Sequence, residues 1–261
     1  MNKLTSVLAV VFGLVVGGPT AVAAVKSMPV AYKDGDTALT GHLFWDDSIV
    51  GKRPGVLVVH EWWGLNDYAK RRASMLAEMG YTAFALDMYG DDKVTNHPAQ
   101  AKEWSDAATA NVEAWRQRAA KGLEILRTSE LTDSSKIAAI GYCFGGSTVM
   151  QLAYAGADLK GVVSFHGALP LPAGDEAKHI KGSVLIEHGN SDAFIPLDRV
   201  DAFKAALSDN GVKFTFNGHQ GARHGFTNPD AGSFGIENVK YDKSADEASW
   251  QSMQAFLKQV F

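Results

Sequence analysis

Hydrophobic residues in this chain alternate between short uninterrupted runs and longer stretches in which they recur every three or four positions. The short runs have the length and composition of strands buried on both faces: Val56–Val59, Thr82–Leu86, Ile137–Ile140, Gly161–Phe165, Val184–Ile186 and Lys213–Phe216. The amphipathic stretches predict helices over Tyr68–Glu78, Pro98–Thr128 (expected to break into two), Ser147–Tyr154, Leu197–Asp209 and Ala245–Gln259. This alternation predicts an α/β fold with a mainly parallel central sheet and helices on both faces.

Two extended segments precede this alternation. Pro29–Tyr32 and Ala38–Trp45 flank turn residues at positions 34–36, a pattern typical of a β-hairpin at a sheet edge. Residues 28–261 hold no internal repeat, low-complexity tract or linker. We therefore expect a single α/β domain over residues 25–261. Its ligand should bind beyond the carboxyl ends of the strands.

The first 24 residues follow a different pattern. Lys3 precedes a largely apolar stretch from Leu4 to Val16 and the small residues Ala-Val-Ala at 21–23, as in a cleavable secretory signal peptide. The apolar stretch is short for a membrane span, so we expect cleavage and no stable span afterwards. An uncleaved N-terminal anchor is the alternative. The predicted destination is outside the cytoplasm, and a bacterial periplasm suits a signal this short.

Composition narrows the possible partners. The 261 residues include 29 acidic and 25 basic side chains without a basic stripe, which argues against nucleic acid as a partner. A small molecule is the expected ligand, and a monomer the expected state. The only cysteine, Cys143, has no partner for an internal disulfide. In an exported protein it is therefore either a buried, inert residue or a reactive one.

The surroundings of Cys143 favour reactivity. The sequence Gly-Tyr-Cys-Phe-Gly-Gly at 141–146 follows a predicted strand and opens a predicted helix, which is the pattern of a nucleophile elbow with cysteine in place of serine. Glycines are expected there because the turn brings backbones close together. The helix N-terminus favours the thiolate. A small core residue on a tight turn is the alternative interpretation.

A cysteine nucleophile needs a base and a group that orients the base. In α/β-hydrolases these follow the nucleophile in the order acid, then histidine. Asp192 and His224 follow predicted strands in that order, so both are expected at the catalytic edge of the sheet. Taken singly, each is equally well explained as an ordinary loop residue, Asp192 by binding local backbone amides. The order and placement of all three favour catalysis.

The other seven histidines are weaker candidates for the base. His188 lies on or just beyond the strand that precedes Asp192, and His60 and His166 end strands where they can line a pocket. We expect the remaining four on the surface or in loops: His42, His97, His179 and His219. The sequence lacks metal-ligand spacing, so we expect neither a metal nor a cofactor.

The segment after the first predicted buried strand is the loop that supplies an oxyanion donor in this fold. We expect the backbone N–H groups of Trp62 and Phe144 to stabilise the negative oxygen of a tetrahedral intermediate. Glu61, beside two tryptophans, places a carboxylate at the pocket mouth. Its alternative role is that of an acid stabilised by a helix dipole.

Together these segments resemble the dienelactone hydrolase family of α/β-hydrolases over essentially all of residues 28–261. The resemblance rests on Val-Val-His-Glu-Trp-Trp-Gly-Leu at 58–65, Gly-Tyr-Cys-Phe-Gly-Gly at 141–146, His-Gly-Asn-Ser-Asp at 188–192 and His-Gly-Phe at 224–226. It implies a Cys143–His224–Asp192 triad and a distinctive glutamate at Glu61. It also implies that the resting thiol lies near Glu61 until substrate displaces the carboxylate, a state that would protect the cysteine from oxidation.

One departure from the family concerns the substrate. Members that act on anionic dienelactones have an arginine four residues after the histidine, where this chain has Asn228. Arg223 lies beside the histidine, but the sequence does not define its direction. The candidate substrate-binding residues are Trp63, Tyr89, Arg223, Phe226 and Asn228. The aromatic residues suggest an apolar acyl or lactone group, and core packing explains them equally well.

The predicted function is cofactor-free hydrolysis of a carboxylic ester or enol-lactone. A general carboxylesterase or thioesterase of the same fold is the first alternative. A catalytically silent periplasmic protein that binds a small ligand is the second, because a fold does not guarantee chemistry. A redox role for the lone thiol is a third, weakened by the absence of a resolving cysteine.

Overall fold

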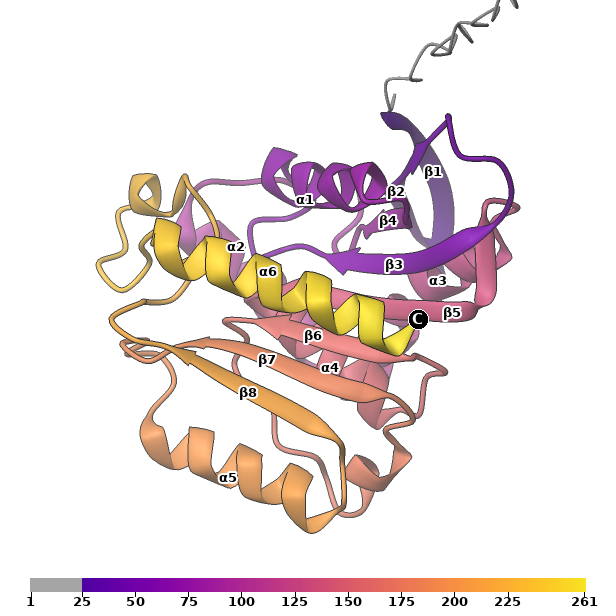
Figure 1. Cartoon of the computed structure of the whole chain (residues 1–261). Coiled ribbons are helices and arrows are strands. Elements are labelled where there is room, and N and C mark those ends of the chain that lie inside the picture. Colours follow the sequence, from indigo (N-terminus) through magenta and orange to yellow (C-terminus); the bar gives the residue numbers. More distant parts are fainter. Residues whose placement is uncertain (1–24) are drawn as a thin grey trace, which may run out of the picture.

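The computed structural model describes residues 25–261, which form one eight-stranded sheet covered by helices (Figure 1). The predicted signal peptide lies outside the described residues. The strands are β1 (Val25–Asp34), β2 (Thr37–Asp46), β3 (Arg53–Val59), β4 (Thr82–Leu86), β5 (Thr132–Tyr142), β6 (Gly161–Phe165), β7 (Ser183–Gly189) and β8 (Phe214–His219). The helices are α1 (Asp67–Glu78), α2 (Pro98–Thr109), α3 (Val112–Thr128), α4 (Phe144–Tyr154), α5 (Leu197–Asp209) and α6 (Lys243–Val260), with short 3₁₀ turns η1 (Glu176–His179) and η2 (Ala231–Phe234).

The sheet is mainly parallel. Its order is β1-β2-β4-β3-β5-β6-β7-β8, and the strands from β4 to β8 all run in the same direction. The first two strands form an antiparallel hairpin, and β2 joins β4 in antiparallel fashion. The predicted fold class and edge hairpin are therefore confirmed. Because the carboxyl ends of parallel strands share one edge, the loops after β3, β5, β7 and β8 come together there.

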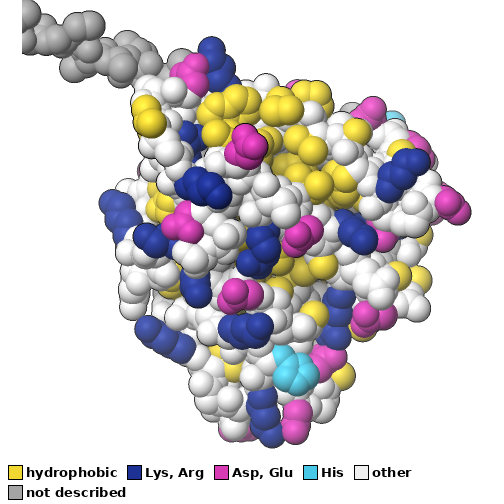
Figure 2. Space-filling view, turned by 90° about the vertical axis from the view of Figure 1, so that its right-hand side faces the viewer, with side chains coloured by type: hydrophobic (Ala, Val, Ile, Leu, Met, Phe, Trp, Pro, Cys, Tyr) yellow, Lys and Arg dark blue, Asp and Glu magenta, His cyan; other side chains and the backbone are white. Residues whose placement is uncertain are grey.

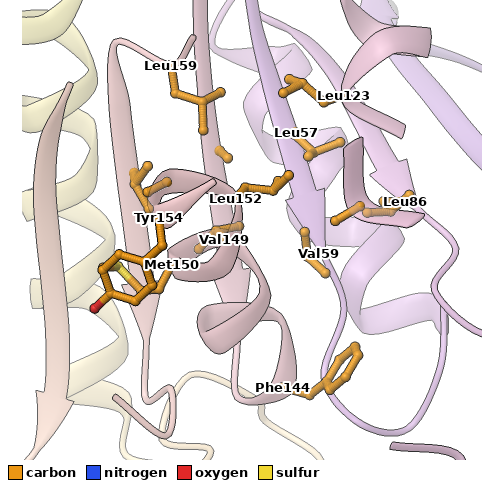
Figure 3. Packing of buried hydrophobic residues seen from close by; sticks show 14 of the residues in the cluster. Leu57, Val59, Leu86, Leu123, Phe144, Val149, Met150, Leu152, Tyr154 and Leu159 are labelled. Carbon is orange, nitrogen blue, oxygen red and sulfur yellow. The ribbon is translucent and has the colours of Figure 1, made fainter. Parts of the chain in front are cut away.

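Helices cover both faces of the sheet. Helices α1 and α6 pack on one face, and α3, α4 and α5 pack on the other (Figure 1). On the second face, Val149 and Leu152 of α4 belong to the same buried cluster as Leu57 and Val59 of β3 (Figure 3). Burial on both faces explains why the inner strands have uninterrupted apolar runs.

Some boundaries differ from the sequence prediction. The hairpin strands are longer because their pairing continues from Val25↔Asp46 to the two-residue turn after Asp34. The long amphipathic stretch does break into two helices, since the Asn111 side chain accepts a hydrogen bond from the N–H of Ala114 and caps α3. Helix α4 begins at Phe144, directly after Cys143, rather than at Ser147.

The outer surface is mixed in charge. Figure 2 shows positive and negative side chains interspersed over the face seen on the right of Figure 1, with apolar side chains gathered near the start of the described chain. Within residues 25–261 none of the helices has the length and apolar character needed to cross a membrane.

Candidate active site

Cys143 occupies a strained turn between β5 and α4. Its backbone has φ 54° and ψ −114°, a conformation that a residue with a side chain adopts only where the surroundings enforce it. The N–H of Cys143 donates to the carbonyl of Phe165 at 3.0 Å. A Cβ on Gly145 would lie 2.2 Å from the carbonyl oxygen of Val59, so only glycine fits. The turn leaves the thiol half-buried at the catalytic edge.

Asp192 and His224 meet at the same edge. The Nδ1 atom of His224 lies 2.7 Å from Oδ2 of Asp192, and both side chains are buried. The second carboxylate oxygen of Asp192, Oδ1, accepts hydrogen bonds from the N–H of Phe194 at 2.9 Å and from Nδ2 of Asn238 at 3.0 Å. The carboxylate is thus fixed in orientation, and Nε2 of the imidazole remains for Cys143.

The electrostatics of the three residues favour an ion pair. Burial alone would lower the pKa of His224, but the charge of Cys143 and the hydrogen bond to Asp192 outweigh it and hold that pKa well above its ordinary value. Burial would raise the pKa of Asp192, but His224 and the donors Phe194 and Asn238 bring it below its usual range. This arrangement stabilises an imidazolium at His224 beside the carboxylate of Asp192.

A loop between η2 and α6 holds the acid and the histidine together. Asn238 donates to Asp192 and accepts from the N–H of Ala193 at 3.0 Å. Its neighbour Val239 forms a parallel bridge with His224, and the N–H of Lys240 donates to the carbonyl of His224 at 3.0 Å. The sequence analysis missed Asn238, because no local motif marks a residue that acts on a loop 46 positions earlier.

The loop that carries Trp62, predicted to supply an oxyanion donor, is held by a hydrogen bond. The hydroxyl of Tyr89 donates to the carbonyl of Trp62 at 3.1 Å, which fixes the peptide that follows Trp62 in the same loop. Phe144 is the first residue of α4, where backbone N–H groups lack partners within the helix. Burial raises the pKa of Tyr89, which therefore stays protonated and acts as a donor. Tyr89, predicted to bind substrate, is buried and holds the loop that carries Trp62.

Glu61 is buried and bound to Asn228. Nδ2 of Asn228 donates to Oε2 of Glu61 at 2.6 Å, and both residues are almost fully buried. Burial raises the pKa of Glu61 to about 7, although Asn228, His224 and Arg72 counteract part of the rise. The resemblance implied that Glu61 contacts the resting thiol. Among the described residues its carboxylate bonds instead to Asn228, while Cys143 pairs with His224.

A buried polar network lies behind the histidine. His166, whose ring meets that of His224 edge to face at 5.3 Å, approaches Thr227 at 2.8 Å through Nε2. Thr227 also bonds to the hydroxyl of Tyr68 at 2.6 Å, and its carbonyl accepts from Arg72 at 2.6 Å. Burial lowers the pKa of His166 well below its ordinary value, so it stays neutral beside the charged His224.

The other predicted substrate-binding residues have partners within the protein. Trp63 is 1% exposed and stacks on Phe234 at 4.0 Å, and Phe226 is fully buried. Arg223 donates to the carbonyl of Glu237 at 2.8 Å. Substrate contact by these residues stays a prediction. Phe194, which the sequence analysis did not single out, is 51% exposed and meets the ring of His224 edge to face at 5.2 Å.

The remaining histidines are only partly where the sequence placed them. His60 and His166 are completely buried, and His97 and His179 are exposed as expected. His42 is half-buried on β2, inside the strand predicted there, and His219 lies on β8, which extends beyond its predicted end, so neither is in a loop. His219 is half-buried and lies 2.6 Å from Glu187.

Comparison with known proteins identifies the family of this chain. The model of the dienelactone hydrolase family matches residues 39–261. A Saccharolobus solfataricus protein that carries the name carboxymethylenebutenolidase is 28% identical over 241 residues, covering 78% of this chain and 89% of that protein. A protein of that name from Synechocystis is 27% identical over 261 residues, covering 91% and 96%.

The chain is also similar in shape to a solved structure. That structure is described as a dienelactone hydrolase-like promiscuous phosphotriesterase from metagenomic libraries, with a TM-score of 0.89 and 38% sequence identity, covering 91% of this chain and 99% of the other. The family match covers most of the chain and includes every segment of the site. The chain therefore belongs to the dienelactone hydrolase family and is a carboxylic ester hydrolase.

Proposed function

We propose that this hydrolase cleaves an uncharged carboxylic ester or enol-lactone, with Cys143 as nucleophile, His224 as base and Asp192 as the acid that orients the base. One observation carries the proposal: a strained turn presents Cys143 to an imidazole whose Nδ1 is already held by Asp192 at 2.7 Å. Fixing the tautomer and direction of the imidazole in this way is what nucleophilic catalysis requires.

Acylation begins from the thiolate–imidazolium pair. The Cys143 sulfur attacks the carbonyl carbon, and the N–H groups of Trp62 and Phe144 stabilise the negative oxygen. When the tetrahedral intermediate collapses, the bond from carbon to the leaving oxygen breaks. The leaving alkoxide or enolate takes a proton from His224, and a thioester on Cys143 remains.

Deacylation uses the same groups in reverse. The now neutral His224 accepts a proton from water as the water attacks the thioester carbonyl. The second tetrahedral intermediate releases the carboxylic acid, and the thiolate–imidazolium pair forms again. Glu61 stays the proposed switch of the resting state, since a carboxyl group whose pKa is about 7 changes charge near neutral pH.

The charge of the site favours an uncharged substrate. Asn228 stands where relatives specialised for anionic dienelactones have arginine, and its amide is committed to Glu61. The nearby guanidinium groups are also engaged, Arg223 with a backbone carbonyl and Arg72 with Asp246. An anionic substrate would meet the carboxyl group of Glu61 without a compensating cation.

The chemistry can be tested by intact-protein mass spectrometry after mixing with 4-nitrophenyl esters and enol-lactones, with turnover followed in parallel. We expect an acyl adduct and turnover with the native chain, and neither with Cys143→Ala. Turnover that survives this substitution would refute the cysteine mechanism. If the protein turns over aryl esters but none of the enol-lactones, the general carboxylesterase or thioesterase would be favoured. Tight ligand binding without any turnover would favour the silent binding protein.

The substrate charge needs a separate test. Asn228→Arg should raise kcat/KM for a carboxylate-bearing enol-lactone relative to its methyl ester by about tenfold, because a cation near the substrate carboxylate adds a charge-assisted hydrogen bond. Asn228→Gln is the matched control and should leave the ratio unchanged. An unaltered ratio in the arginine variant would show that position 228 does not select substrate charge.

Phosphotriester hydrolysis is a second candidate activity. It is favoured by the likeness, at 38% identity and a TM-score of 0.89, to a protein described as a promiscuous phosphotriesterase. In this reaction Cys143 would attack phosphorus and expel the leaving phenolate. Release of 4-nitrophenol from a dialkyl 4-nitrophenyl phosphate, abolished by Cys143→Ala, would support it. The absence of release by an esterase-active preparation would exclude it.

We also propose that the protein acts after export. The support is the charged, apolar and small-residue pattern of residues 1–24. Expression of the full chain in a bacterium, followed by osmotic release of the periplasm, should yield a shortened protein. Its measured mass should match a chain that begins at Ala24 or Val25. Recovery of the full-length chain with the membrane pellet would favour the uncleaved anchor.

A further inference from the structure

A cavity lies beside the proposed active site, between α5 and the last two strands of the sheet. Its volume is about 540 Å³, comparable to that of small-molecule sites. It is lined by His188, Asn190, Ser191, Asp192, Ala193, Ile195, Pro196, Leu197, Val200, Asp201, Lys204 and Phe216. Of these residues the proposed mechanism uses only Asp192, which leaves the rest of the lining without a function.

His188 presents an unused hydrogen-bonding group to this cavity. The residue is 4% exposed, and its Nδ1 atom is enclosed without a hydrogen-bond partner among the described residues. Burial lowers the pKa of His188, so the ring is neutral. An enclosed lone pair is tolerated better than an enclosed N–H, which places the proton on Nε2. The Nε2–H group is therefore a donor available to a ligand.

Lys204 adds a positive charge to the same cavity. Its ammonium group lies 4.1 Å from the centre of the Phe216 ring, and within residues 25–261 it forms no salt bridge. Lys204 as a whole is half-buried, and the contact with Phe216 holds its ammonium group at the cavity wall. Asp192 is already bound to His224, and Asp201 is exposed, so solvent screens its negative charge.

Apolar side chains make up more than half of the remaining lining. Ile195, Val200 and Phe216 line the cavity, and Leu197 at its rim is 77% exposed. Two donors beside apolar walls suit a ligand with an anionic acceptor at one end and a hydrocarbon body at the other. We propose that this cavity binds a monocarboxylate with a short apolar chain, through Lys204 and His188. The inference goes beyond the proposed function, because it does not depend on chemistry at Cys143.

Calorimetric titration of the Cys143→Ala protein at pH 7.5 tests the proposal without interference from ester chemistry. The probes are hexanoate, its neutral analogue hexanamide and its cationic analogue hexylamine. We expect hexanoate to bind about tenfold more tightly than hexanamide, the effect of one charge-assisted hydrogen bond, and hexylamine not to bind. Equal binding of hexanoate and hexanamide, or no binding of hexanoate, would overturn the proposal.

Substitutions then locate the binding. Lys204→Met keeps an apolar side chain of similar length over Phe216, and should weaken hexanoate binding by about tenfold. Lys258→Met on α6, which packs on the opposite face of the sheet, removes the same charge and should change nothing. Asp201→Asn should tighten binding about twofold by removing a screened repulsion. Equal effects of Lys204→Met and Lys258→Met would place any binding outside this cavity.

Discussion

The buried carboxyl group of Glu61 should make the stability of this protein depend on pH in a way that a single substitution removes. Burial raises the pKa of Glu61 from 4.5 to about 7. Between those values the folded state keeps a proton that the unfolded state has released, so stability falls as pH rises. Below pH 4.5 the carboxyl group of Glu61 is protonated in both the folded and the unfolded state. Above pH 7 the full loss of stability caused by ionising this buried group is present.

The magnitude follows from the shift. At about 1.4 kcal/mol per pKa unit, the shift of Glu61 corresponds to a total cost of about 3 kcal/mol, of which about 2.5 kcal/mol develops between pH 5 and pH 8. Glu61→Gln cannot ionise, yet its amide oxygen can still accept from Asn228. The variant should therefore gain about 2.5 kcal/mol over the native chain as pH rises across this interval.

Urea denaturation of both proteins at half-unit steps from pH 5 to pH 8 measures the difference directly. Titrating groups that do not interact with Glu61 affect both proteins alike and cancel in the difference. Glu124→Gln, at an exposed position on α3, is the matched control and should show no pH-dependent difference. A Glu61→Gln difference that stays constant across the range would refute the assignment of a raised pKa to Glu61.

Three further substitutions test the support of the site. Asn238→Ala removes a donor to the Asp192 carboxylate, so kcat/KM should fall about tenfold, and the acidic limb of the pH profile should move upward because the pKa of Asp192 rises. Tyr89→Phe removes the hydrogen bond that fixes the oxyanion loop and should lower kcat about fivefold with little change in KM. Gly145→Ala drives a methyl group to 2.2 Å from a backbone oxygen of β3 and should destabilise the fold by about 3 kcal/mol, whereas Gly232→Ala, with open space around it, should not.

Each of these predictions has a result that contradicts it. An Asn238→Ala enzyme that loses activity without a shift in its pH profile would indicate general loosening rather than an effect on the acid. A Tyr89→Phe enzyme that changes only KM would assign the tyrosine to substrate binding. Equal melting temperatures of the two alanine variants would show that the strained turn relaxes without cost.

The fold and the proposed triad were predicted from local patterns in the sequence. Apolar runs identify strands buried on both faces, and a nucleophile turn is contained within six consecutive residues, so a single sequence reveals both. Asp192 and His224 were located by the strands they follow. Strand ends were predicted less well, because pairing with a neighbouring strand extends β5 and β8 beyond their apolar segments.

The supporting contacts were beyond the reach of the sequence. Asn228 is bound to Glu61, 167 positions away, and Tyr89 is bound to the carbonyl of Trp62, 27 positions away. Neither contact has a local pattern, because amides and hydroxyls at such positions have many equally plausible partners until the chain is folded. The sequence identified Asn228 as a departure from the family, and the structure adds that its amide is bound to the buried carboxylate.

The loop that carries Asn238 also couples the proposed site to the last helix of the described chain. This loop leads directly into α6, whose side chains Met253, Phe256 and Leu257 are buried against the sheet. Asn238 bonds to Asp192, and Val239 and Lys240 pair with the backbone of His224. The proposed acid and histidine are therefore tied to the segment that precedes α6. A change that loosens the docking of α6 should for this reason also loosen the proposed site.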